Sequence, residues 1–119
     1  MKDLSLYIHI PFCESKCYYC NFVSFKACDC EKEKYVNSLI KEIELNKNKK
    51  DIVKTIFIGG GTPSSLNNGD ILKISNTIFK NFNVSKNVEF TIEVNPNSFT
   101  KEKAKEYKQS GINRLSFGL

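Results

Sequence analysis

The chain alternates short apolar segments with amphipathic ones, and this order restricts its possible folds more than any other feature. Strands are expected at residues 4–10, 55–58, 88–94 and 112–119 because apolar residues there alternate or run together. Helices are expected at residues 31 to about 48, 71–79 and 100–111, and residues 47–51 form a polar connection. Thr100 suits a helix N-cap, and Gly111 suits a left-handed helix end. Strict alternation of strand and helix predicts an α/β fold with a parallel sheet and right-handed crossovers.

Three of the four expected strands keep one polar face. In a doubly wound sheet helices cover both faces, so the strands would be almost continuously apolar. A closed or half-closed TIM-like barrel accounts better for a polar face, because its helices lie outside and its interior can hold a ligand. The residues expected on this inner face are Tyr7, His9, Thr91, Glu93, Asn95, Arg114 and Ser116.

Leu119 lies inside the fourth expected strand. Four strands cannot close a barrel, and an exposed strand edge invites aggregation. We therefore expect residues 1–119 to be the N-terminal part of a single barrel domain in a longer protein.

Three cysteines follow the first strand with the spacing C-x3-C-x2-C, at Cys13, Cys17 and Cys20. Three thiolates suit a 4Fe-4S cluster, in which they leave one iron open for chemistry. A structural zinc site usually has four ligands, often from two separated C-x2-C pairs, so the triplet favours iron over zinc or over thiols that bind no metal. Loops that follow the strands lie at the C-terminal mouth of a barrel, where active sites are found.

Cys28 and Cys30 lie a few residues farther on. They could supply a fourth ligand, which would make the metal structural, or they could be free thiols before the helix. We favour free thiols.

A glycine loop, Gly59-Gly60-Gly61-Thr62-Pro63, follows the second expected strand and should lie at the same mouth. Glycines let backbone groups approach a ligand closely, and Thr62 adds a hydroxyl. The loop is not a phosphate loop, since no Gly-Lys-Ser/Thr follows. A tight turn without a ligand is the alternative interpretation.

Glu93 is the most informative carboxylate because it lies on the inner face at the end of the third expected strand. It needs a cation or hydrogen-bond donors, which a ligand ammonium or hydroxyl, Arg114 or a lysine could supply. Tyr7 and His9 share the inner face of the first strand and are the candidates for a catalytic role. A histidine in the position of His9 is more often a hydrogen-bonded residue of the barrel interior than a ligand or base.

The formal charge of +5 comes almost wholly from lysines that alternate with glutamates, as in residues 31–34 and 101–103. This pattern is typical of solvated helix faces, and it does not favour a nucleic-acid partner. Neither a signal segment nor a transmembrane run is present in the sequence. We expect a protein of the reducing cytoplasm.

Five motifs, LYIHIPFC, KCYYCNF, IGGGTPS, EVNP and GINRLSFG, occur in this order at residues 6–13, 16–22, 58–64, 93–96 and 111–118. Together they resemble the radical S-adenosylmethionine family of oxygen-independent coproporphyrinogen III oxidases and their heme-chaperone relatives. The resemblance extends from the first strand to the last residue.

The resemblance implies a partial (βα)6 barrel in which Cys13, Cys17 and Cys20 hold a 4Fe-4S cluster. S-adenosylmethionine would occupy the open iron, and one electron would cleave it to a 5'-deoxyadenosyl radical. By motif position, the contacts to this first S-adenosylmethionine would come from Tyr7, Gly60 and Glu93. The contacts to a second one would come from Tyr19, Gly61 and Thr62.

Two features of the resemblance separate its branches. The oxidases have a further cysteine two places after the third, where this chain has Phe22, and a long leader before the first strand. Both favour a heme chaperone over an oxidase that decarboxylates coproporphyrinogen propionates to vinyl groups. Heme or coproporphyrinogen, an electron donor and a heme-acceptor protein are the implied partners, with His9 a chemically suitable heme ligand. A zinc-binding module without enzymatic activity is the remote alternative.

Overall fold

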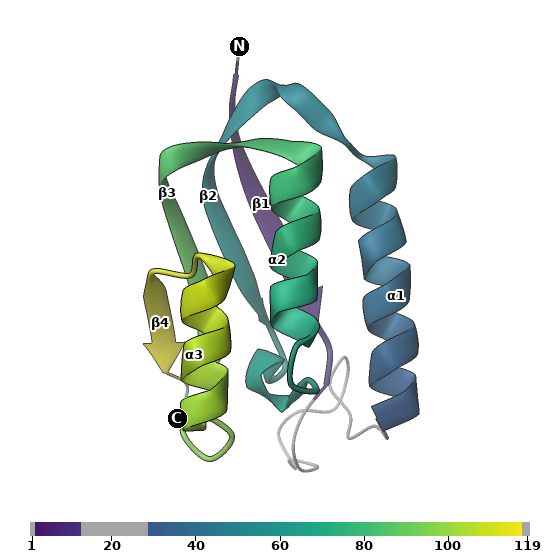
Figure 1. Ribbon diagram of the computed structural model, residues 1–119, viewed down its shortest axis with the longest axis vertical. Coiled ribbons are helices and arrows are strands. Elements are labelled where there is room, and N and C mark those ends of the chain that lie inside the picture. The colour runs from purple at the N-terminus through teal and green to yellow at the C-terminus, as the bar shows by residue number, and fades with distance from the viewer. Residues whose placement is uncertain (1, 13–28, 118–119) are drawn as a thin grey trace.

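The computed structural model describes residues 2–12 and 29–117 (Figure 1). Its elements, in chain order, are β1 (Asp3–Ile10), α1 (Asp29–Leu45), β2 (Asn48–Gly60), the 3-10 turn η1 (Pro63–Ser65), α2 (Asp70–Asn81), β3 (Phe82–Val94), α3 (Lys101–Ser110) and β4 (Arg114–Phe117). The strands form one sheet in the order β1-β2-β3-β4, and each neighbouring pair is parallel. The predicted α/β class is confirmed.

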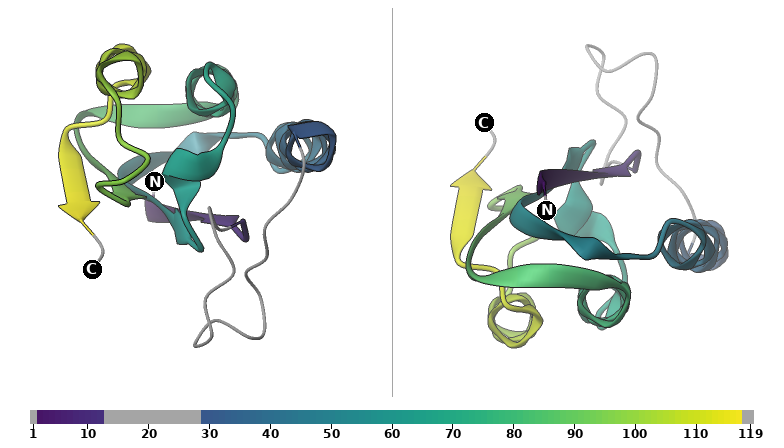
Figure 2. Two further views of the ribbon diagram at one scale, coloured as in Figure 1. Left: turned by 90° about the horizontal axis from the view of Figure 1, so that it is seen from below. Right: turned by 90° about the horizontal axis from the view of Figure 1, so that it is seen from above.

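The sheet is curved, and the three helices lie along its convex side (Figure 2). The core forms where the apolar rows of the strands meet the apolar face of α2. Ile10, Ile58, Phe90 and Ile92 from the strands and Ile74 from α2 are completely buried. Burial of one such side chain contributes about 1.5–3 kcal/mol, so this layer accounts for much of the stability.

The opposite, concave face carries the polar rows that the sequence predicted. Strand register places Tyr7, Phe57, Thr91 and Arg114 side by side in one row, because paired residues of parallel strands point to the same face. The next row toward the mouth contains His9, Gly59, Glu93 and Ser116. The predicted inner face is thus confirmed for these residues, and Phe57 is an addition to it.

The prediction of a polar connection at residues 47–51 was wrong, because β2 already begins at Asn48. Lys2 supplies the reason: its backbone N–H donates to Asp51 Oδ1 (3.0 Å), and its carbonyl accepts from Ile52 N–H (2.9 Å). Asn48 itself pairs with Phe82, where β3 begins six residues before the predicted Val88. Polar residues therefore extend the sheet because neighbouring strands satisfy their backbone groups.

Helix α3 begins and ends as predicted. Thr100 Oγ1 accepts from Lys103 N–H (3.2 Å), and Gly111 adopts the left-handed conformation after the last turn. The prediction that residues 101–103 form a solvated face was wrong for Lys103, which is only 9% exposed. None of the helices within the described ranges is long and apolar enough to cross a membrane.

Candidate functional site

The carboxyl ends of the strands meet at one edge of the sheet, and this edge forms the candidate site. Ile10, the last residue of β1, pairs with Gly60, the last residue of β2. Glu93 lies one residue before the end of β3 and pairs with Ser116 of β4. The glycine loop and Glu93 are therefore brought together as the sequence predicted, from segments about thirty residues apart.

The predicted metal ligands Cys13, Cys17 and Cys20, together with Tyr19 and Cys28, lie outside the described residues. The structure places the residues that precede them: Ile10 O accepts from Gly61 N–H (2.7 Å), and Phe12 O accepts from Thr62 N–H (2.6 Å). Residues 10–12, which precede the cysteine segment, thus lie directly beside the glycine loop. Cys30 lies in the first turn of α1 and is exposed.

Gly60 occupies a position that no other residue fits. Its φ of +118° is unfavourable for residues with a Cβ, and a Cβ there would lie 2.6 Å from Ile10 O and 2.8 Å from the His9 ring. At Gly59 a Cβ would collide with Glu93 Oε1 and would lie 2.6 Å from the Phe57 ring. The glycines therefore let the loop backbone pass tightly between β1 and Glu93.

Glu93 uses one carboxylate oxygen to hold this loop, because its Oε1 accepts from Gly60 N–H at 2.9 Å. Glu93 is partly buried. Arg114, a possible partner, forms an ion pair with Glu89 and not with Glu93. A carboxylate has about four acceptor positions, so Glu93 can also accept from a ligand ammonium or hydroxyl. An acceptor beside a backbone that only glycine can adopt fits an amino acid or nucleoside ligand such as S-adenosylmethionine.

Tyr7 and His9 form a pair on the inner face, with Tyr7 Oη 3.2 Å from His9 Nδ1. Partial desolvation, and to a smaller extent the negative charge of Glu93, raise the pKa of the Tyr7 phenol above its usual value. Tyr7 therefore remains a protonated donor near neutral pH. Its ring, 59% exposed, stacks on Phe57 with the centroids 6.0 Å apart.

Phe57 was missed as a site residue because the sequence places it in a continuous apolar run, which reads as wholly buried. Its alternation with Ile56 and Ile58 was the signal that could have found it: those two are buried, whereas Phe57 is 36% exposed on the other face.

Ser64, at the far end of the glycine loop, connects the loop to the end of β3. Its Oγ forms a short hydrogen bond with Ser98 Oγ and accepts from Asn95 N–H (3.1 Å). The backbone after β3 is thereby tied to the loop after β2.

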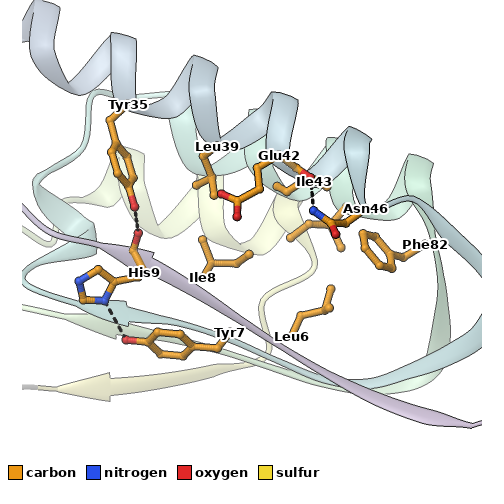
Figure 3. A pocket seen from close by; sticks show the side chains of 11 residues that line it. Leu6, Tyr7, Ile8, His9, Tyr35, Leu39, Glu42, Ile43, Asn46 and Phe82 are labelled. Atoms are coloured by element: carbon orange, nitrogen blue, oxygen red, sulfur yellow. Dashed lines mark hydrogen bonds between the residues drawn. The ribbon is translucent and has the colours of Figure 1, made fainter.

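A cavity of about 270 Å³ lies on the helix side of β1, beneath α1. Its lining includes Leu6, Ile8, Leu39 and Phe82, and also Tyr7 and His9, whose rings lie across β1 from Leu6 and Ile8 (Figure 3). Tyr35 at its end donates from its hydroxyl to His9 O. This cavity is separated by β1 from the face that carries Glu93 and is not part of the candidate site.

Comparison with known proteins decides the family. The family model described as the Radical SAM superfamily matches residues 7–119. The chain belongs to the radical SAM superfamily. Membership implies S-adenosylmethionine and a 4Fe-4S cluster as cofactors.

Similar proteins come from both branches of the resemblance. The chain is 46% identical to "Heme chaperone HemW" of Buchnera aphidicola (strain Sg), over 100% of this chain and 32% of that protein. It is 40% identical to "Oxygen-independent coproporphyrinogen III oxidase" of Helicobacter pylori (strain 26695), over 98% of this chain and 26% of that protein.

A solved structure has the same fold. The coproporphyrinogen III oxidase HemN of Escherichia coli, described as a radical SAM enzyme, superposes with a TM-score of 0.91 at 31% identity, over 99% of this chain and 28% of that one. The predicted barrel fold is confirmed. The chain spans about a third or less of the length of these relatives.

Proposed function

We propose that this chain is the N-terminal part of a radical SAM heme chaperone and that residues 1–119 form part of a single barrel domain. The observation that carries this proposal is the 46% identity, over the whole chain, to a protein named as a heme chaperone. Phe22, at the position where the oxidases have a further cysteine, supports the same branch.

Cys13, Cys17 and Cys20 are the proposed ligands of the 4Fe-4S cluster, which when bound would supply one-electron reduction of S-adenosylmethionine. The chain's own residues would bind and orient that ligand. Glu93 would accept from its amino or hydroxyl groups, the Gly60 backbone would lie against it, and Tyr7 would donate a hydrogen bond from its phenol. Tyr19, Gly61 and Thr62 are the proposed contacts of a second S-adenosylmethionine.

Oxygen-independent oxidation of coproporphyrinogen III is the second candidate function, because a 40% identical relative and the superposed structure carry that name. In either case a porphyrin-type partner and an electron donor are proposed. A heme-acceptor protein is proposed for the chaperone alone.

The cluster is tested by anaerobic reconstitution of the purified protein with iron and sulfide. We expect a brown protein with about four irons per chain, since three thiolates suit a 4Fe-4S cluster. Cys17→Ser should abolish the colour, while Cys30→Ser, in the first turn of α1, should leave it unchanged. Full iron content in Cys17→Ser would contradict the ligand assignment, and one tightly bound zinc without cluster formation would favour the zinc module.

The two functions are separated by assays on the same reconstituted protein. With reductant, S-adenosylmethionine and coproporphyrinogen III, we expect no vinyl product. With heme, we expect stoichiometric binding in an absorbance titration. Formation of vinyl product at catalytic turnover would establish the oxidase instead.

A further inference from the structure

Two lysines that the sequence assigned to solvated helix faces bind residues 65 and 66, which follow the glycine loop. Lys32 Nζ, from the first turn of α1, donates to Ser65 O at 2.8 Å. Lys103 Nζ, from the first turn of α3, donates to Leu66 O at 2.6 Å. Two ammonium groups from different helices therefore bind consecutive carbonyls at the end of η1.

The burial of these lysines requires an explanation. Lys103 is 9% exposed and Lys32 is partly buried, whereas lysine is almost never buried in folded proteins unless it is paired. Removing an ammonium from water is unfavourable unless hydrogen bonds compensate it. Hydrogen bonds from a charged donor are roughly twice as strong as neutral ones, so both contacts restrain the loop firmly.

Helix α3 also supplies a carboxylate, Glu106, that binds the start of α2. Glu106 is 7% exposed, and its two oxygens accept from Gly69 N–H (2.9 Å) and Leu72 N–H (3.1 Å) at the start of α2. Lys103 and Glu106 are three residues apart on one face of α3. One helix therefore fixes both ends of residues 66–69, the connection from the glycine loop to α2.

The near end of the loop is held by the backbone that leads into the cysteine segment, through Ile10 O and Phe12 O. Lys32 belongs to the helix that begins after the same segment. Residues on both sides of 13–28 thus bind this region: Phe12 O accepts from Thr62 in the glycine loop, and Lys32 donates to Ser65, two residues after the loop. The loop cannot shift relative to these flanks without breaking a hydrogen bond at one side or the other.

We propose that Lys32 and Lys103 are positioning residues, which keep the Gly59–Thr62 backbone in place beside residues 10–12, from which the chain continues to the proposed cluster ligands. They act through Ser65 and Leu66 and do not touch the ligand themselves. This inference rests on the proposed function, in which that backbone receives S-adenosylmethionine.

The test uses the complete gene product with its cluster reconstituted and reduced. S-adenosylmethionine is titrated, and binding is followed through the change it causes in the electron paramagnetic resonance spectrum of the cluster. We expect Lys32→Met to weaken binding about tenfold, as the loss of a charge-assisted hydrogen bond would, without loss of iron. Lys32→Arg should restore most of the affinity. Lys34→Met, at an exposed lysine of the same helix, should bind like the wild type.

Lys103→Met is compared with Lys105→Met, at an exposed lysine of α3, and should weaken binding at least as much as Lys32→Met. If Lys103→Met does not fold, the half-buried Lys32 decides the question alone. Equal affinities of Lys32→Met and the wild type would overturn the inference, as would loss of iron from Lys32→Met. No response in the wild type itself would instead refute the proposed function.

Discussion

At the scale of single residues, Gly60 has the most restricted position in the candidate site. Its backbone conformation disfavours a side chain, and the space that a Cβ would need is filled by Ile10 O and the His9 ring. Gly69 provides a natural comparison, because its φ is +93° but a Cβ there would meet no atom within 4 Å. Comparing an alanine substitution at Gly60 with one at Gly69 therefore separates the cost of backbone strain from the cost of a steric clash.

Gly60→Ala should lower the free energy of unfolding by about 2–4 kcal/mol, because left-handed strain of about 1 kcal/mol adds to a clash with a backbone carbonyl. Gly69→Ala should lower it by about 1 kcal/mol, from strain alone. Urea denaturation of the purified variants measures both values. Equal losses would show that the loop moves aside for the added methyl group.

Residue patterns predicted part of this site and missed part of it. Glu93, Gly60 and Tyr7 could be found because each follows or faces a recognisable strand end. Lys32 and Lys103 could not be found, since a lysine between glutamates has the same local sequence whether it contacts water or a carbonyl more than thirty residues away. Only the packing of α1 and α3 against residues 65 and 66 separates the two cases.

At the scale of elements, helix α2 is capped by another helix. Its N-cap residue is Gly69, which has no side chain to accept from the first turn. Glu106 of α3 supplies the acceptor from 37 residues away, and its negative charge lies at the positive end of the α2 dipole. A second polar contact joins the two helices, because the Ser75 hydroxyl of α2 donates to Ser110 O of α3.

Glu106→Gln should lower the free energy of unfolding by about 1–3 kcal/mol, because a buried carboxylate that accepts two backbone N–H groups is replaced by a neutral amide. The amide protons of Gly69 and Leu72 should exchange faster with solvent. Glu102→Gln, at an exposed position of the same helix, is the control and should change stability by less than about 0.5 kcal/mol. Unchanged exchange at both amides would contradict the capping role.

At the scale of the whole molecule, the order of elements was predictable, but the extent of the sheet was not. Alternating apolar residues identified β1, β3 and β4, since burial against helices imposes a period of two, and a continuous apolar run identified β2. The additional paired residues at the start of β2 and β3 mix polar and apolar side chains, as in the pairs Asn48–Phe82 and Ile52–Asn83. They belong to strands because a neighbouring strand lies beside them. Such pairing depends on contacts that no local pattern contains.

The hydrogen bonds that fix the residues before and after the cysteine segment affect the entropy of metal binding. Phe12 O accepts from Thr62 N–H, and Lys32 donates to Ser65 O, so the described residues on both sides of 13–28 are fixed to neighbouring positions of one connection. The entropic cost of bringing these two flanks together is therefore met when the sheet and α1 fold, before any metal ion binds.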